Sequence, residues 1–111
     1  MNTRSQLLKG VLEGCILAII AQAPTYGYEL SLKLQEFGLE EVSEGSIYPI
    51  LLRLQKFDLI TGTMQKSAAG PKRKYYHLTE SGKQALATFT DQWEAMKGPV
   101  DSMLQKAEGG I

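Results

Sequence analysis

The stretch Ser43–Phe57, SEGSIYPILLRLQKF, predicts a helix with two different faces. Ser43 is a good N-cap residue, and Pro49 is expected near the first turn, where its missing amide costs least. One face is apolar and carries Ile47, Ile50, Leu51 and Leu54. The other carries Gly45, Tyr48, Pro49, Leu52, Arg53 and Lys56. A helix with a purely structural role would not normally expose tyrosine, proline and leucine together, so this face is a candidate recognition surface.

A two-stranded hairpin is expected directly after this helix. The stretch Leu59–Gln65 is rich in β-branched and apolar residues, Lys72–Leu78 is its expected partner, and Ser67–Pro71 is the tip. Strand alternation divides the second strand into one face with Lys74, Tyr76 and Leu78 and another with Arg73, Tyr75 and His77. Tyr76 and Leu78 are the better candidates for the core.

The hairpin carries a local positive charge that the net charge of the whole chain does not reveal. The formal net charge of the 111 residues is zero, which argues against indiscriminate binding of polyanions. No acidic residue lies between Asp58 and Glu80, whereas the hairpin contains Lys66, Lys72, Arg73 and Lys74. A helix followed by a basic hairpin is typical of a winged helix-turn-helix, and the pattern predicts a DNA-binding surface.

Two further helices are expected before this unit. A capping box at Thr3–Gln6 predicts a first helix over Arg4–Gln22, apolar on more than one side. Gly10, Gly14 and Ala18 recur every four residues on it, which would allow another helix, or a ligand, to approach closely. Ala23-Pro24 ends this helix. Thr25 is expected to cap a second helix over Tyr26–Phe37, with Gly38 as its left-handed stop.

The last part of the chain predicts a helix that needs a partner. Thr79 is the expected cap, and the helix runs from Glu80 to about Ala107 with a break at Gly98-Pro99. Its apolar residues alternate in steps of three and four: Leu86, Phe89, Trp93, Met96, Val100, Met103 and Ala107. This is a heptad seam, and the simplest partner for it is a second copy of the chain. We therefore expect residues 1–79 to form the DNA-binding domain and residues 80–111 a dimerisation helix and tail.

Bulk composition excludes several other classes of protein. The chain is 43% hydrophobic and 22% charged, as expected of one small globular domain, and its longest apolar run is too short to span a bilayer. We therefore expect no membrane association and a cytoplasmic location. The single cysteine, Cys15, has no partner and is expected to be a small buried hydrophobe. His77 is the only histidine, and no nucleophile pair or metal cluster accompanies it, so we expect neither an enzyme nor a cofactor.

Three segments together resemble the PadR family of bacterial transcriptional regulators. They are Tyr26-Gly27-Tyr28-Glu29-Leu30, Gly45-Ser46-Ile47-Tyr48-Pro49-Ile50-Leu51 with Arg53-Leu54, and Gly70-Pro71 with Arg73-Lys74-Tyr75-Tyr76, Leu78-Thr79 and Gly82. The resemblance covers roughly residues 7–93. It implies a mainly α-helical fold with a small β-hairpin, namely a winged helix-turn-helix plus a C-terminal dimerisation helix. It also implies a homodimeric repressor bound to a pseudo-palindromic operator in double-stranded DNA.

One segment departs from the family pattern. Phe57-Asp58-Leu59 stands where many relatives have Asp-Gly-Leu, so the turn into the first wing strand lacks the usual glycine. The resemblance therefore says less about how the wing is oriented.

Eight residues are the candidate DNA contacts: Ser46, Tyr48, Pro49, Arg53, Lys66, Lys72, Arg73 and Lys74. Residues at the start of a recognition helix meet base edges in the major groove, whereas the wing cations would contact phosphates or a narrow minor groove. Alternatively, Ser46 is only a capping residue, Tyr48 is half buried, and Arg53 is solvated or paired within the chain.

A second candidate site lies on the expected dimer axis. Some PadR members respond to phenolic acids and others to flat cationic drugs bound between the subunits. The residues that we expect at this ligand site or at the dimer interface are Leu7, Val11, Gly14, Ala18, Leu86, Phe89, Trp93, Met96 and Val100. Trp93 could sandwich a planar inducer or be plain core, and Glu13 and Glu94 could counter a cationic ligand. The competing function is a winged-helix adaptor that docks another protein through Tyr48, Pro49 and Leu52.

Overall fold

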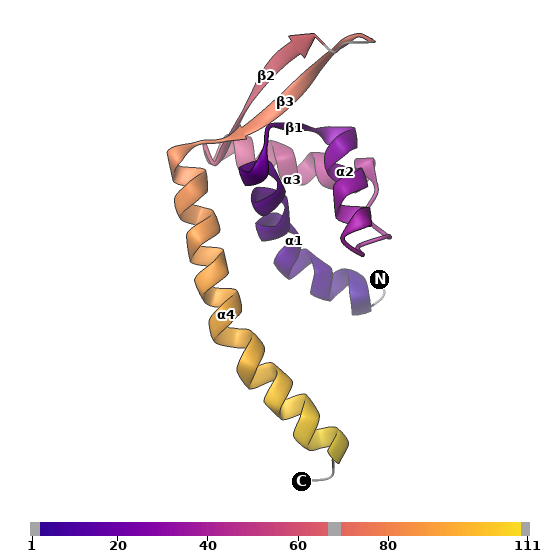
Figure 1. Cartoon of the computed structure of the whole chain (residues 1–111), viewed down its shortest axis with the longest axis vertical. Helices are drawn as coiled ribbons and strands as arrows, with labels where there is room; N and C mark the ends of the chain where they lie inside the picture. The colour runs from indigo at the N-terminus through magenta and orange to yellow at the C-terminus, as the bar shows by residue number, and fades with distance from the viewer. Residues whose placement is uncertain (1–2, 67–69, 110–111) are drawn as a thin grey trace.

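The computed structural model describes residues 3–66 and 70–109, with side chains from residue 7 onward. Four helices lie on one side of a small antiparallel sheet with strand order β1-β3-β2, and the β2–β3 hairpin projects beyond them (Figure 1). The elements are α1 (Thr3–Gln22), β1 (Thr25–Tyr26), α2 (Gly27–Glu36), α3 (Glu44–Lys56), β2 (Ile60–Lys66), β3 (Lys72–Leu78) and α4 (Glu80–Gly109). This is the expected winged helix-turn-helix with a long C-terminal helix. The capping-box side chains of Thr3–Gln6 and residues 67–69 of the hairpin tip lie outside the described residues.

The core lies where α1, α2 and α3 meet beneath the sheet. Its fully buried side chains include Ile16 of α1, Leu30 and Leu34 of α2, and Leu51 and Leu54 of α3. Tyr76 of β3 and Ile60 of β2 close it from the side of the hairpin. The apolar face predicted for α3 is thus the buried face, and its opposite face is exposed.

The turn between α2 and α3 is made by a left-handed glycine and a capping box. Gly38 has φ +116°, and the amide of Leu39 donates back to the carbonyl of Leu34 at 3.0 Å. The Ser43 side chain accepts from the amide of Ser46, while the Ser46 side chain accepts from the amide of Ser43. Both helix ends are therefore stabilised locally, and the predicted Gly38 stop and Ser43 cap are confirmed.

The start of α2 differs from the prediction. Thr25 and Tyr26 form a short strand that pairs with Tyr76 and Tyr75 of β3, and α2 begins only at Gly27. Thr25 is completely buried, and its hydroxyl donates to the carbonyl of Ala23 at 2.7 Å. The prediction that Thr25 caps a helix starting at Tyr26 is wrong because sheet pairing with β3 fixes this segment in an extended conformation.

The hairpin pairs in a register that determines which side chains share a face. Met64 lies opposite Lys74, Lys66 opposite Lys72, and Gly62 opposite Tyr76. Directly opposed residues of an antiparallel pair project to the same side of the sheet. On this face, residues near the base of the hairpin are buried in the core: Ile60 is 2% exposed and Tyr76 is 5% exposed. Toward the tip the same face is exposed, as Met64 shows with 61%.

The turn into β2 uses a residue other than glycine in the left-handed region. Asp58 has φ +58°, and its amide donates to the carbonyl of Gln55 at 3.0 Å. Aspartate tolerates this conformation better than most residues. The chain thus makes the turn that a glycine would make in many relatives, and β2 follows in regular antiparallel pairing.

Helix α4 follows β3, and its first turn packs against Leu59 in the turn before β2. The rest of the helix extends away from the body of the molecule. The hydroxyl of Thr79 accepts from the amide of Gly82 at 2.9 Å, which confirms Thr79 as the cap. The chain measures 58 × 28 × 23 Å, and its radius of gyration of 16.3 Å exceeds the about 13 Å expected for a compact domain of this length. Figure 1 shows the reason: the C-terminal half of α4 extends beyond the other helices.

The expected break in this helix is absent. Helix α4 is continuous through Gly98 and Pro99, and this part of the helix is exposed. Because Gly98 has no Cβ to clash with the following proline ring, it can remain helical where most residues would be pushed out. The prediction of a break between Lys97 and Val100 is therefore wrong.

Candidate nucleic-acid interface

The exposed face of α3 and the adjoining hairpin form one surface. Tyr48 and Leu52 of α3 are 42% and 66% exposed, and Pro49, Arg53 and Lys56 are exposed beside them. Pro49 is the sixth residue of α3, shortly after its first turn. It leaves the carbonyl of Gly45 without its usual helical donor, at an exposed position where water can replace it.

Ser46 has a structural role at the start of this helix. Its hydroxyl donates to the carbonyl of Ser43 at 2.7 Å and accepts from the Ser43 amide at 3.0 Å. The capping alternative is therefore the arrangement observed in this structure. The side chain is still exposed, and its oxygen also accepts from the hydroxyl of Ser43 at 3.4 Å.

Tyr48 is held in place by a carboxylate and by a close contact with α2. Its hydroxyl donates to Glu44 Oε2 at 2.7 Å. A Cβ at position 27 would lie 2.7 Å from the same hydroxyl, so a larger residue there would displace the Tyr48 ring. The hydrogen bond to Glu44, with some burial, raises the pKa of Tyr48 to about 12. The phenol is thus a neutral, oriented group at the N-terminal end of α3.

Arg53 connects α3 to α1. Its Nη2 donates to Glu13 Oε2 at 2.7 Å, across forty residues of sequence. Both side chains remain partly exposed, at 53% for Arg53 and 39% for Glu13, so the guanidinium can still donate its other N–H groups outward. Glu13 is therefore committed to Arg53 here, and Glu94 pairs with Lys97 at 3.2 Å.

The four wing cations divide between the two faces of the hairpin. The register places Lys66, Lys72 and Lys74 on one face. Arg73 lies on the other, where its guanidinium carbon is 4.4 Å from the centre of the Tyr26 ring. Tyr26 in turn meets Tyr75 edge to face, with ring centres 5.3 Å apart. Arg73 thus reaches back from the outer part of β3 and stacks on Tyr26 of β1.

A hollow of about 420 Å³ lies between α3 and the wing. It is lined by Tyr26, Gly27, Tyr28, Glu44, Tyr48, Arg73, Lys74 and Tyr76. Five of these residues were not among the predicted contacts: Tyr26, Gly27, Tyr28, Glu44 and Tyr76. The first three belong to the segment Tyr26–Leu30, which indicated the family but not a location beside α3. The hollow combines two cations, one carboxylate and several phenol rings.

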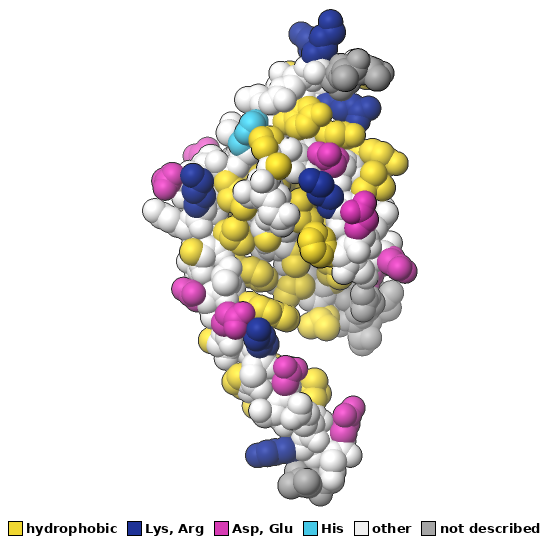
Figure 2. Space-filling model, in the orientation of Figure 1, with side chains coloured by type: hydrophobic (Ala, Val, Ile, Leu, Met, Phe, Trp, Pro, Cys, Tyr) yellow, Lys and Arg dark blue, Asp and Glu magenta, His cyan; other side chains and the backbone are white. Residues whose placement is uncertain are grey.

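An apolar groove of about 500 Å³ lies between α1 and α4. Its walls include six of the residues predicted for the second site: Leu7, Val11, Phe89, Trp93, Met96 and Val100. Leu7 is 75% exposed and Trp93 47%, which is unusual for side chains of this size. Figure 2 shows hydrophobic side chains gathered on this face of the molecule, with charged groups mostly at its margins.

Three residues predicted for the second site lie elsewhere. Gly14 is buried beneath Phe89, and a Cβ at this position would overlap the Phe89 ring. Leu86 packs against the core. Ala18 lines a separate hollow between α1 and α2, together with Cys15 and Phe37. The structure thus brings together the two ends of the predicted set, from α1 and from the middle of α4, but not these three.

Other chemistry has little support in the described residues. Within residues 3–66 and 70–109, no cluster of three His, Cys, Asp or Glu side chains could hold a metal ion. His77 Nε2 lies 3.0 Å from Thr63 Oγ1. Cys15 is half-buried, which raises the pKa of its thiol. None of the described helices is both long and apolar enough to cross a membrane.

Comparisons with known proteins agree with this architecture. Residues 16–88 match the model of the transcriptional regulator PadR-like family. A crystal structure of a PadR-like transcriptional regulator from Bacillus cereus is 57% identical, covers 90% of this chain and 97% of its own, and superposes with a TM-score of 0.85. A Streptococcus transcriptional regulator is 44% identical, covers 88% and 96% of the two chains, and has a TM-score of 0.82. A protein of Lysinibacillus sphaericus is 30% identical over 107 residues, which are 95% of this chain and 98% of that protein.

Proposed function

This chain belongs to the PadR-like family of transcriptional regulators, which regulate by binding DNA and are not enzymes, and we propose that it is a homodimeric repressor released from its operator by a flat aromatic ligand. The observation that carries the proposal is the groove between α1 and α4, with Trp93 exposed at its edge. Such a protein would work in the cytoplasm, where its DNA lies. The adaptor alternative would need no concentration of lysines on the wing.

The exposed half of α4 supports a second copy as the partner. Every residue from Asp91 to Gly109 is exposed in the single chain, and the apolar ones are Trp93, Met96, Val100, Met103 and Leu104, with Ala95 and Ala107. Burying one such large side chain typically stabilises an interface by about 1.5–3 kcal/mol. Two antiparallel or crossing copies of this helix would cover both seams by the same contacts.

The DNA contacts follow from the position of α3 and the wing. In the proposed complex the N-terminal half of α3 enters the major groove with Ser46, Tyr48 and Pro49. The flanking phosphates are contacted by Arg53 and by four wing residues, Lys66, Lys72, Arg73 and Lys74. A dimer makes each contact twice, and its two heads fit successive major grooves only at a separation of about 34 Å.

Release would act through that separation. A ligand in the groove contacts α4 through Trp93 and Met96 and α1 through Val11, so it favours one arrangement of these helices over others. DNA favours the arrangement in which the two winged-helix units are separated by one turn of the duplex. The ligand can weaken DNA binding only by its differential affinity for the two dimer states.

Sedimentation velocity tests the dimer. Val100→Glu places a charge in the middle of the seam and should shift the protein toward monomer, because the carboxylate would have to be buried in the interface. Gln105→Glu, on the same helix but off the seam, is the matched control and should leave the dimer intact. A Val100→Glu protein that sediments like the wild type would remove α4 from the interface.

Gel shifts on the DNA upstream of the gene test release. A planar phenolic acid and a flat aromatic cation serve as probe ligands, and binding is also followed by the fluorescence of Trp93, the only tryptophan in the chain. Trp93→Ala should impair release more than it impairs DNA binding, whereas Trp93→Phe retains an aromatic ring and should release at higher ligand concentration. Equal loss of DNA binding and release in Trp93→Ala would contradict the proposed site.

A further inference from the structure

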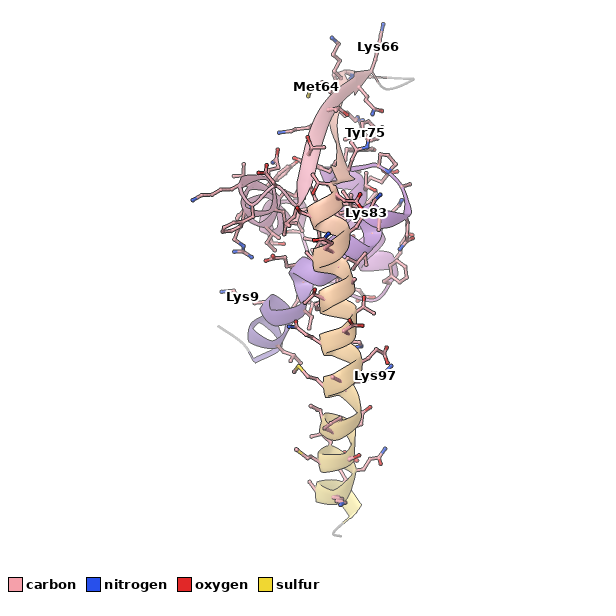
Figure 3. The ribbon with its side chains drawn as sticks, turned by 90° about the vertical axis from the view of Figure 1, so that its left-hand side faces the viewer. Lys9, Met64, Lys66, Tyr75, Lys83 and Lys97 are labelled. Carbon is pink, nitrogen blue, oxygen red and sulfur yellow. The ribbon has the colours of Figure 1, made fainter. Side chains whose placement is uncertain are left out.

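On the face of the hairpin that carries Lys66, Lys72 and Lys74, the described part of the outer wing has one large apolar side chain, that of Met64. Met64 of β2 lies directly opposite Lys74, and the next pair on the same face is Lys66 with Lys72. These four side chains therefore project to one side of the hairpin. Figure 3 shows Met64 and Lys66 toward the tip of the wing, away from the helices.

Met64 is not covered by its cross-strand neighbour. The Lys74 side chain folds over Gly62, where an added Cβ would lie 3.0 Å from Lys74 Cγ, and its Nζ lies 5.7 Å from the centre of the Tyr76 ring. Lys74 thus turns toward the base of the wing. Met64 is left 61% exposed. Single exposed methionines are ordinary on protein surfaces, but this one shares its face only with cations and the base of the hairpin.

The lysine pair at the tip makes this face a site for anions. Like charges directly opposite each other on a sheet repel, and Lys66 and Lys72 are so placed. Phosphates on both sides of a groove would relieve that repulsion. Between two such phosphate strands lie the deoxyribose walls of the minor groove, which is about 6 Å wide.

We propose that Met64 is the apolar contact of the wing with DNA, packing on deoxyribose in the minor groove between phosphates held by Lys66 and Lys72. The inference rests on the proposed DNA binding of the wing and adds to it a residue and a mode of contact. Methionine is one of the side chains that minor-groove proteins insert, and its flexible thioether fits an irregular wall. The contact carries little base information, so it strengthens binding to many sequences alike.

Affinity measured at several salt concentrations tests this contact. With DNA from upstream of the gene, Met64→Ala should lose roughly fivefold to tenfold in affinity, the scale expected for one partly buried apolar side chain. Its salt dependence should match that of the wild type because no charge is removed. Lys66→Ala should instead flatten the salt dependence, by a slope of about 0.9 for each phosphate that the variant no longer neutralises.

Two variants separate an apolar contact from a general effect on the wing. Met64→Leu retains the apolar volume and should bind nearly as well as the wild type. Gln65→Ala lies on the opposite face of the same strand and should bind within about twofold of it. Met64→Ala with wild-type affinity, or Met64→Leu as weak as Met64→Ala, would overturn the inference while leaving the proposed function intact. Wild-type protein without salt-dependent DNA binding would instead overturn the proposed function.

Methionine oxidation gives an independent readout on the unmodified protein. Peroxide transfers one oxygen atom to the thioether sulfur and is reduced to water, and mass spectrometry locates the product. Saturating DNA should slow the oxidation of Met64 severalfold. Met96 and Met103, 59% and 70% exposed in the single chain, lie on α4 and should react at the same rate with and without DNA. Oxidation of Met64 at an unchanged rate in the complex would contradict the contact.

Discussion

Replacing Gly82 of α4 with alanine should destabilise the fold, because an added Cβ would meet backbone atoms that cannot move aside. Gly82 is the only buried residue of α4 within the described part of the helix, and it faces the turn that leads into β2. A Cβ at this position would overlap the carbonyl oxygen of Leu59 and lie 3.0 Å from its carbonyl carbon. Both atoms belong to the backbone, so no side-chain rotation can relieve the overlap.

The size of the effect follows from what must move. Shifting α4 away from Leu59 would weaken two hydrogen bonds made by Thr79, from its amide to Leu59 O at 3.1 Å and from its hydroxyl to Asp58 O. Overpacking typically costs about 1–3 kcal/mol and each such bond about 1 kcal/mol, whereas alanine returns about 1 kcal/mol of helix propensity. The expected net loss is roughly 2–4 kcal/mol, or a melting temperature lower by roughly 10–20 °C.

Thermal and urea unfolding followed by circular dichroism, at one fixed protein concentration, measure this loss. Gly45→Ala is the control because it is also helical but exposed, with no atom within 4 Å of an added Cβ. It should stabilise slightly, by up to about 1 kcal/mol. If Gly82→Ala were as stable as the wild type, the close packing of α4 on Leu59 would not exist as described.

Three further outcomes test separate parts of the structure. Asp58→Gly should stabilise the protein by roughly 0.5–1 kcal/mol because glycine adopts φ +58° without strain, and a less stable variant in urea unfolding would contradict this turn. The hydrogen bond to Glu44 favours the protonated phenol of Tyr48, so its stabilisation is complete below the ordinary pKa of 10.0 and is lost as the pH rises toward about 12. Tyr48→Phe should remove one tyrosine's share of the tyrosinate absorbance that appears near that pH, and an unchanged amplitude there would refute the assignment. The ion pair between Arg53 and Glu13 is more than one third exposed on both sides, so a double-mutant cycle should give a coupling of only about 0.2–1 kcal/mol, and a value well above this would contradict its exposure.

Local patterns in the sequence predicted most of the secondary structure. Period-two alternation identified Tyr76 as a core residue, and capping residues marked the starts of α3 and α4 at Ser43 and Thr79. The strand at Thr25–Tyr26 was missed because two residues show no periodicity, and only pairing with β3 gives them their conformation. A proline within α4 suggested a break, but the preceding Gly98 removes the clash that would have caused it.

Contacts between distant segments could not be predicted in the same way. The pairing of Arg53 with Glu13 depends on how α1 crosses α3, and no local pattern records that crossing. The exposure of Met64 depends on the register of the hairpin, which pairs it with Lys74 of the other strand. The prediction that Trp93 and Val11 lie near each other is met by the groove that both residues line. The apolar stripe of the C-terminal helix had to pack on another apolar surface, and the first helix carries one. Gly14 was predicted to line that groove but instead fits beneath Phe89.

The contact between Gly82 and Leu59 also makes α4 a long lever. A helix of 30 residues is about 45 Å long, so a rotation of only about 5° at its first turn moves its far end by about 4 Å. In a dimer joined through that far end, the same small angle would alter the distance between the two recognition helices. In the proposed dimer, the packing of Gly82 on the carbonyl of Leu59 would then help to set the distance between the two recognition helices.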